Sequence, residues 1–191
     1  IAETFYANLK VRMDKLRIGS PLDKCIDVGA IVDQSQLDTI TRMVAENTAG
    51  TMHQSSAALP EDGLFYPPTL ITDLHPADTL MQEEIFGPVL TSIPFSTEEE
   101  ALSMANDTDY GLTGYVWTND LTRALRFTEA LEAGMIWVNS ENVRHLPTPF
   151  GGVKASGIGR DGGDSSCEFY MEQKHIGFAT GQHKITKLGA L

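Results

Sequence analysis

Cysteine and long apolar runs are both scarce in this sequence. Only two cysteines occur among 191 residues, Cys25 and Cys167, and they stand far apart in the chain. Such a pair provides neither the ligand spacing of a zinc site nor a disulfide framework, and together with seven methionines it favours a reducing, cytoplasmic location. No apolar run approaches the roughly 18 residues that cross a bilayer, so we expect no membrane association.

Basic residues are also few. Fourteen Lys and Arg stand against 26 Asp and Glu, which gives a formal net charge of -12. Because the basic residues are scattered and form no stripe, a nucleic acid is excluded as the expected partner. Hydrophobic residues make up 41% of the chain, a share typical of a globular protein rather than a disordered one. The chain begins with Ile1, already inside a helical pattern, so we expect a piece of a longer protein or a processed chain.

Apolar periodicity and turn residues predict short helices and strands. Helices are predicted over 1–16 and roughly 35–47, the second capped by Ser35, and a further helix is capped by Ser96. The other predicted elements are a short strand near 51–54, an extended stretch 64–73, a strand Val89–Phe95, a strand Tyr115–Trp117, a helix capped by Asn119 or Asp120 and ending at Gly134, and a strand Met135–Val138.

Residues 89–139 therefore alternate strand, helix, strand, helix, strand. This order predicts an α/β fold with parallel strands and crossover helices, in which ligands lie beyond the carboxyl ends of the strands. The loop Asn139–Phe150 begins at such an end. Its Arg144, with His145, fits a clamp for an anionic substrate, because a guanidinium presents a fork to a carboxylate. Alternatively, Arg144 and His145 form a surface pair, or Arg144 makes an ion pair with Glu141.

Three further features of the sequence have alternative interpretations. The glycine-rich Phe150–Arg160 fits a phosphate cradle, but it matches neither the dinucleotide fingerprint nor a P-loop, so a structural turn is favoured. The two carboxylates of Glu83–Val89 fit either a ribose-binding group or a solvated acidic turn. Trp117 and Trp137 fit either the core or a platform for a ligand, and the core is favoured.

Cys167–Thr180 is expected to be extended and, leaving its own domain, to pair with another subunit.

Four separated segments resemble the aldehyde dehydrogenase superfamily. They are Glu83–Val89 (EEIFGPV), Asn106–Leu112 (the N-x-x-x-Y-G-L turn), Gly134–Asn139 (GMIWVN) and Pro149–Arg160 (PFGGVKASGIGR). Their order and separation match the C-terminal half of such an enzyme, and the resemblance covers nearly the whole chain. The segments NVRHLPTPFGG, SGIGRDGGD and FYMEQKHI are most similar to the branch that acts on 5-carboxymethyl-2-hydroxymuconate semialdehyde.

The resemblance implies part of the parallel-sheet catalytic domain of the aldehyde dehydrogenase fold over 1–163, an oligomerisation arm over 164–182 and a tail over 183–191. It also implies a homodimer or homotetramer, an aldehyde as substrate, and NAD or NADP as cofactor. In this family a Cys thiolate attacks the aldehyde, a hydride passes to the nicotinamide, and water hydrolyses the resulting thioester to a carboxylic acid.

The same resemblance implies roles for individual residues near the cofactor and the substrate. Glu84 resembles the carboxylate that holds the nicotinamide ribose, and Phe86 resembles the aromatic residue beside the nicotinamide. Phe150 resembles an aromatic residue of the substrate pocket. The stretch 140–148, which contains Arg144 and His145, resembles the specificity loop.

Three further residues, Asp161, Arg160 and Glu172, also resemble family positions. Asp161 stands where many members have a Glu that helps to order water, and its shorter side chain is a departure from the family pattern. Arg160 and Glu172 resemble residues that tie the substrate pocket to the oligomerisation strand.

A larger departure is the absence of the family's nucleophile. Its Gly-Gln-x-Cys segment lies upstream of the region that this chain matches, as do the general-base Glu, the oxyanion Asn and the dinucleotide-binding domain. Cys25 and Cys167 stand at the wrong positions, so we expect no catalytic nucleophile here and the remaining N-terminal half of the enzyme as a partner. A catalytically silent assembly subunit is the alternative, and betaine or benzaldehyde-type aldehydes are alternative substrates.

Overall fold

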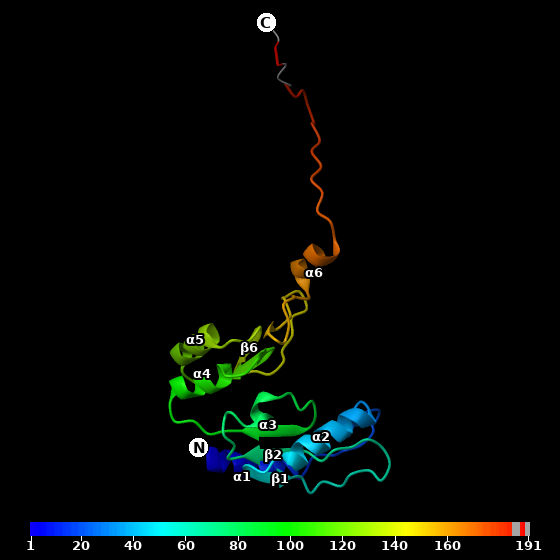
Figure 1. Ribbon diagram of the computed structural model, residues 1–191. Helices are drawn as coiled ribbons and strands as arrows, with labels where there is room; N and C mark the ends of the chain where they lie inside the picture. Colours follow the sequence, from blue (N-terminus) through cyan, green and yellow to red (C-terminus); the bar gives the residue numbers. More distant parts are fainter. Residues whose placement is uncertain (185–187, 190–191) are drawn as a thin grey trace. The chain divides into compact units, whose positions relative to one another are not determined.

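The computed structural model describes residues 1–184 and 188–189 (Figure 1). They divide into two compact units. Unit 1 holds Ile1–Asp109 with Glu129–Leu131, and unit 2 holds Tyr110–Thr128 with the described residues from Glu132 onward. The tail expected over 183–191 lies in part, at 185–187 and 190–191, outside the described residues.

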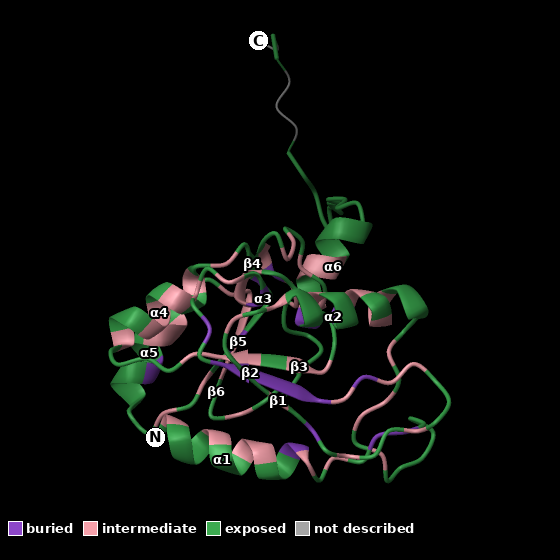
Figure 2. Ribbon diagram, turned by 60° about the horizontal axis from the view of Figure 1, so that its bottom comes forward, coloured by how far each residue is buried: buried purple, intermediate pink, exposed green. Residues whose placement is uncertain are grey.

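Unit 1 contains a three-stranded sheet in the order β1-β2-β3. The strands are β1 (Thr51–Gln54), β2 (Thr69–Thr72) and β3 (Val89–Ser92). β1 runs antiparallel to β2, and β3 runs parallel to it, so the parallel pairing expected of the fold is present here in part. β2 is central and buried throughout, as its purple ribbon in Figure 2 shows. Its β-branched and Leu side chains suit a strand that is covered on both faces.

Four helices belong to unit 1. They are α1 (Ala2–Met13), α2 (Gln34–Glu46), α3 (Thr79–Gln82) and α4 (Glu98–Asn106). The helices predicted over 1–16 and 35–47 are thereby confirmed, whereas α3 was not expected. Within the described residues, no helix combines the length and the apolar composition that a membrane crossing requires.

The helix caps differ from the predicted ones. Asp33, not Ser35, caps α2, because its carboxylate accepts the backbone N–H of Gln36 at 2.8 Å. That hydrogen bond holds the pKa of Asp33 below its usual value. Thr97, not Ser96, caps α4 by accepting the N–H of Glu100 at 3.1 Å. Ser35 and Ser96 are also good caps by residue type, so type alone did not distinguish them from Asp33 and Thr97.

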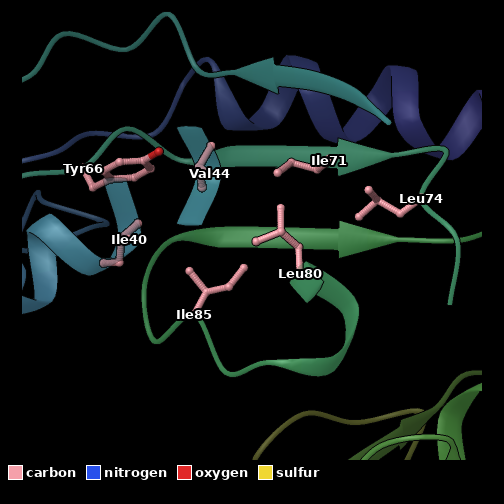
Figure 3. Packing of buried hydrophobic residues seen from close by; sticks show 7 residues of the cluster. All are labelled: Ile40, Val44, Tyr66, Ile71, Leu74, Leu80 and Ile85. Atoms are coloured by element: carbon pink, nitrogen blue, oxygen red, sulfur yellow. The ribbon is translucent and has the colours of Figure 1, made fainter. Parts of the chain in front are cut away.

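The core of unit 1 lies between α2, β2 and the segment around α3 (Figure 3). It is built from seven buried side chains: Ile40, Val44, Tyr66, Ile71, Leu74, Leu80 and Ile85. Ile40 and Val44 are one helical turn apart on α2, so the apolar stripe that predicted this helix is also the face that packs. Ile85 brings the segment before β3 into the same core.

Unit 2 contains two small sheets. β5 (Thr113–Val116) and β6 (Met135–Val138) run parallel on either side of α5 (Leu121–Ala130) in the sequence, as predicted. β4 (Tyr110–Gly111) and β7 (Val153–Lys154) form an antiparallel pair that was not predicted. All elements expected over 89–139 are present, and within unit 1 β3 pairs with β2.

The side chains of the β5–β6 pair depart from one expectation. Trp137 is half-buried and stacks on Tyr115, its partner across the two strands, with ring centroids 5.4 Å apart. Trp117 is 68% exposed, so its expected place in the core is wrong for the described structure. Trp117 follows the last residue of β5, which among the described residues pairs only with β6.

The C-terminal segment is helical before it is extended. α6 spans Gly163–Tyr170, so the prediction of an extended stretch from Cys167 is wrong for its first residues. Gly162 is the N-cap of α6 and Gly163 is its first residue, and both have positive φ. Neither residue contributes to an apolar periodicity, so the sequence pattern did not indicate where this helix begins. From Met171 the described chain has no regular structure and is exposed, as the trace leaving α6 in Figure 1 shows.

We predict that Ile40→Ala lowers the free energy of unfolding by about 2–5 kcal/mol, because the side chain is fully buried and its loss leaves a cavity. Urea unfolding followed by circular dichroism measures the change. Leu22→Ala is the matched control, since Leu22 is 93% exposed, and its effect is expected within about 0.5 kcal/mol. Equal effects of the two substitutions would contradict the assignment of Ile40 to the core.

Candidate functional site

The α3–β3 loop (Glu83–Pro88) carries two of the predicted site residues. Glu84 and Phe86 are exposed, and Phe86 is 67% exposed, while Ile85 between them is buried in the core of unit 1. Phe86 has a φ of +53°, a left-handed conformation that is an outlier for a bulky residue. Strained backbone of this kind persists where the surroundings fix it, and it often occurs at functional positions.

Helix α2 fixes the α3–β3 loop from one side. The side-chain amide of Gln36 donates to the carbonyl oxygens of Ile85, at 2.9 Å, and Phe86, at 3.3 Å. Gly87 lies against Ile40, whose Cδ1 would be 2.5 Å from any Cβ at that position. Sequence reasoning missed Gln36, because nothing in a helix N-terminus indicates a partner some fifty positions away.

A cavity of about 630 Å³ lies beside this loop within unit 1. Glu83 and Glu84 line it together with the end of α2. Its one arginine, Arg42, makes an ion pair with Glu46 at 3.0 Å. The remaining carboxylates accept hydrogen bonds, so this side of the loop suits hydroxyl groups better than phosphates.

The β6 loop (Asn139–Phe150) begins at the carboxyl end of β6, as predicted. Asn139 joins the ends of the two parallel strands: its side chain accepts from the N–H of Thr118 at 2.9 Å and donates to the Thr118 carbonyl at 2.8 Å. Further along, the indole N–H of Trp137 donates to the Val143 carbonyl at 3.0 Å. Both contacts fix the backbone and leave the loop's polar side chains exposed.

Arg144 lies over the ring of Phe150, with its guanidinium carbon 4.1 Å from the ring centroid. This is the geometry of a cation–π contact. Within the described residues Arg144 makes no ion pair, so the expected alternative of a pair with Glu141 is not observed. His145 is exposed, and its carbonyl accepts the N–H of Thr148 at 2.9 Å, which closes a turn. The structure thus brings Arg144 and Phe150 together.

Asp161 lies beside Phe150 through the backbone. The Phe150 N–H donates to the Asp161 carbonyl at 2.6 Å, and the Asp161 N–H donates to the Phe150 carbonyl at 2.7 Å. The carboxylate of Asp161 accepts the hydroxyl of Ser166 and the N–H of Gly162, each at 2.8 Å. This side chain is therefore engaged with the start of α6.

The glycine-rich segment folds on itself. Arg160 donates to the carbonyls of Gly152, at 2.6 Å, and Gly159, at 2.9 Å, and so crosses the turn. These contacts fit the structural-turn interpretation of Phe150–Arg160. Glu172 is exposed and makes no ion pair with Arg160 in the described part of the chain.

The predicted site residues fall into two groups. Glu84 and Phe86 belong to unit 1, whereas Arg144, His145, Phe150 and Asp161 belong to unit 2. Cys25 and Cys167 are both exposed and lie outside these groups. Among the residues that the structure describes, no three His, Cys, Asp or Glu side chains gather as metal ligands.

Comparison with known proteins supports the resemblance of the four sequence segments to the aldehyde dehydrogenases and the α/β fold. The aldehyde dehydrogenase family pattern matches residues 1–176. A betaine aldehyde dehydrogenase of Cereibacter sphaeroides is 41% identical over 178 residues, covering 92% of this chain and 37% of that relative. The structure of HpcC from Thermus thermophilus has a TM-score of 0.81 at 39% identity, covering 98% of this chain and 38% of that one.

A second solved structure relates the fold to a cofactor. Betaine aldehyde dehydrogenase from Staphylococcus aureus, in complex with NAD+, has a TM-score of 0.82 at 33% identity and covers 91% of this chain and 36% of that one. The chain thus spans less than two fifths of the length of these relatives. With a family match over nearly its whole length and more than 30% identity to these relatives, the chain belongs to the aldehyde dehydrogenase family.

Proposed function

We propose that this chain is the C-terminal part of an NAD(P)-dependent aldehyde dehydrogenase that oxidises an anionic aldehyde to a carboxylic acid. Family membership supports the reaction class, and the NAD+ complex of a relative supports the cofactor class. A cysteine elsewhere in the longer protein attacks the aldehyde to form a thiohemiacetal, and water later hydrolyses the thioester to the acid and the free thiol. When bound, NAD(P) supplies the hydride acceptor.

The α3–β3 loop fits the cofactor role. The exposed carboxylate of Glu84 accepts hydrogen bonds from the two hydroxyls of a ribose, and the exposed ring of Phe86 offers an apolar face to a nicotinamide. Gln36 and the buried Ile85 fix the backbone on which both side chains stand. A binding group on a fixed backbone loses little conformational entropy when its ligand arrives.

The observation that carries the substrate class is the position of Arg144 over Phe150. The ring holds the guanidinium in place, and the edge of the guanidinium remains available, since no carboxylate in the described residues pairs with it. An Arg held in this way binds both oxygens of a substrate carboxylate. The protein as a whole is acidic, so an anionic substrate needs such a local cation.

The same contact argues against a betaine-type substrate. Betaine aldehyde carries a quaternary ammonium group, which proteins recognise with open aromatic faces. In this chain the guanidinium of Arg144 already covers one face of Phe150 and adds a positive charge there. A cationic aldehyde is therefore disfavoured, although relatives named betaine aldehyde dehydrogenase are about 40% identical.

We also propose that the segment after α6 joins a second copy of the protein in a homodimer or homotetramer. Met171, Ile176 and Phe178 are 65%, 64% and 84% exposed in a stretch without regular structure. Backbone of this kind presents free donors and acceptors to the edge of another sheet. The catalytically silent assembly subunit is not favoured, because the named relatives are dehydrogenases.

We predict that Arg144→Ala in the full-length enzyme lowers kcat/KM for a carboxylate-bearing semialdehyde by about 10- to 150-fold, as expected for one charged hydrogen-bonding group. Steady-state kinetics with a neutral aldehyde of similar size is the control and is expected to change little. Arg144→Lys keeps the charge but loses the planar fork. Its kcat/KM for the semialdehyde is therefore expected to lie between the values of the parent enzyme and of Arg144→Ala. Equal losses for both aldehydes would assign Arg144 a structural role.

We predict that Glu84→Gln reduces turnover by roughly 100-fold without reducing stability, because a misplaced nicotinamide ribose misaligns the reacting atoms. Kinetics at saturating NAD(P) and the melting temperature of each variant measure the two effects separately. Glu83→Gln is the matched control, since Glu83 is the exposed neighbour on the same loop. A lower melting temperature with normal kcat per folded enzyme would show that Glu84 is structural.

A further inference from the structure

We infer that Asp161–Gly163, here called the support segment, sets the selectivity of the proposed enzyme by positioning the β6 loop. This inference rests on the proposed function. It assigns Asp161, Gly162 and Gly163 as positioning residues that act through Arg144 and Phe150.

The two glycines let the β6 loop approach α6 closely. Any Cβ on Gly163 would overlap the Pro147 carbonyl oxygen, and a Cβ on Gly162 would be 2.7 Å from the Thr148 carbonyl oxygen and 2.9 Å from that of Leu146. Both glycines also have positive φ, +94° at Gly162 and +55° at Gly163. A side chain at Gly162 or Gly163 is therefore disfavoured for two independent reasons, the close carbonyl oxygens and the positive φ.

Asp161 fixes the support segment at its first residue. Its carboxylate oxygen accepts both the Ser166 hydroxyl and the Gly162 N–H, while its backbone exchanges two hydrogen bonds with Phe150. One residue thus joins the start of α6 to the ring on which Arg144 lies. A shift of Asp161 or Gly163 moves that ring or the turn at 145–148, and with it the guanidinium.

This geometry gives Asp161 a different role from the water-ordering one expected from the family resemblance. The Oδ1 atom of Asp161 already accepts two protein hydrogen bonds. An amide oxygen accepts the same two bonds but carries no negative charge. Asp161→Asn therefore separates the roles: a positioning residue tolerates this change, whereas a charged group that orders water for hydrolysis does not.

The first experiment compares Gly163→Ala with Gly159→Ala in the full-length enzyme. A Cβ on Gly159 would have no heavy atom within 4 Å, and the φ of Gly159 is not positive, so Gly159→Ala is the matched control. We expect Gly163→Ala to lower the ratio of kcat/KM for a carboxylate-bearing semialdehyde to that for a neutral aldehyde by about 10- to 100-fold, because small misplacements of binding groups are costly. Gly159→Ala leaves the ratio unchanged. An unchanged ratio in Gly163→Ala would overturn the inference.

The second experiment detects a displacement of the β6 loop in the absence of substrate. The Trp137 indole N–H donates to the Val143 carbonyl in the β6 loop. In a Trp117→Phe background, the part of the acrylamide quenching that a further Trp137→Phe substitution removes therefore reports the position of this loop. We expect faster quenching in Asp161→Ala and Gly163→Ala, and the parent value in Asp161→Asn and Gly159→Ala. Parent quenching in all four variants would overturn the support role. If the parent enzyme oxidises neither aldehyde, the proposed function is wrong, and the quenching result still decides whether Asp161–Gly163 holds the loop.

Discussion

The pair of backbone hydrogen bonds between Phe150 and Asp161 is the contact on which unit 2 depends for its proposed chemistry. It joins the end of the β6 loop to the start of α6 at N···O distances of 2.6 and 2.7 Å. Phe150 in turn carries the guanidinium of Arg144, and Asp161 begins the turn that the two following glycines complete. Without this bridge, an exposed arginine on a loop would have no defined position, and its charge would give little selectivity.

In unit 1, the proposed cofactor contacts also depend on side chains that are exposed. Glu84 and Phe86 of the α3–β3 loop are exposed, so burial does not fix their positions. The chain alternates them with a buried Ile85 and uses the Gln36 amide to hold two carbonyls of the loop. In both units, therefore, hydrogen bonds to loop backbone position the side chains to which we assign ligand contacts. Binding groups held in this way are pre-organised.

Local pattern predicted the elements better than their partners. The apolar stripe of α2 and the short apolar run of β6 are each visible within a few consecutive residues, so both elements were predicted from the sequence. The pairing of β3 with β2 and the hydrogen bonds of Gln36 depend on residues far away in the chain, which periodicity does not contain. The start of α6 was missed because its N-cap Gly162 and its first residue Gly163 have positive φ and add nothing to an apolar pattern.

We propose, above all, that this chain supplies substrate and ribose contacts to an aldehyde dehydrogenase whose nucleophile lies elsewhere in the protein. The most direct test is NAD(P)H formation from a carboxylate-bearing semialdehyde, measured side by side for the full-length protein and for residues 1–191 alone. We expect NAD(P)H from the full-length protein and none from residues 1–191, because loss of a nucleophile costs several orders of magnitude in rate. NAD(P)H formation by residues 1–191 alone, or none by the full-length protein, would contradict the claim.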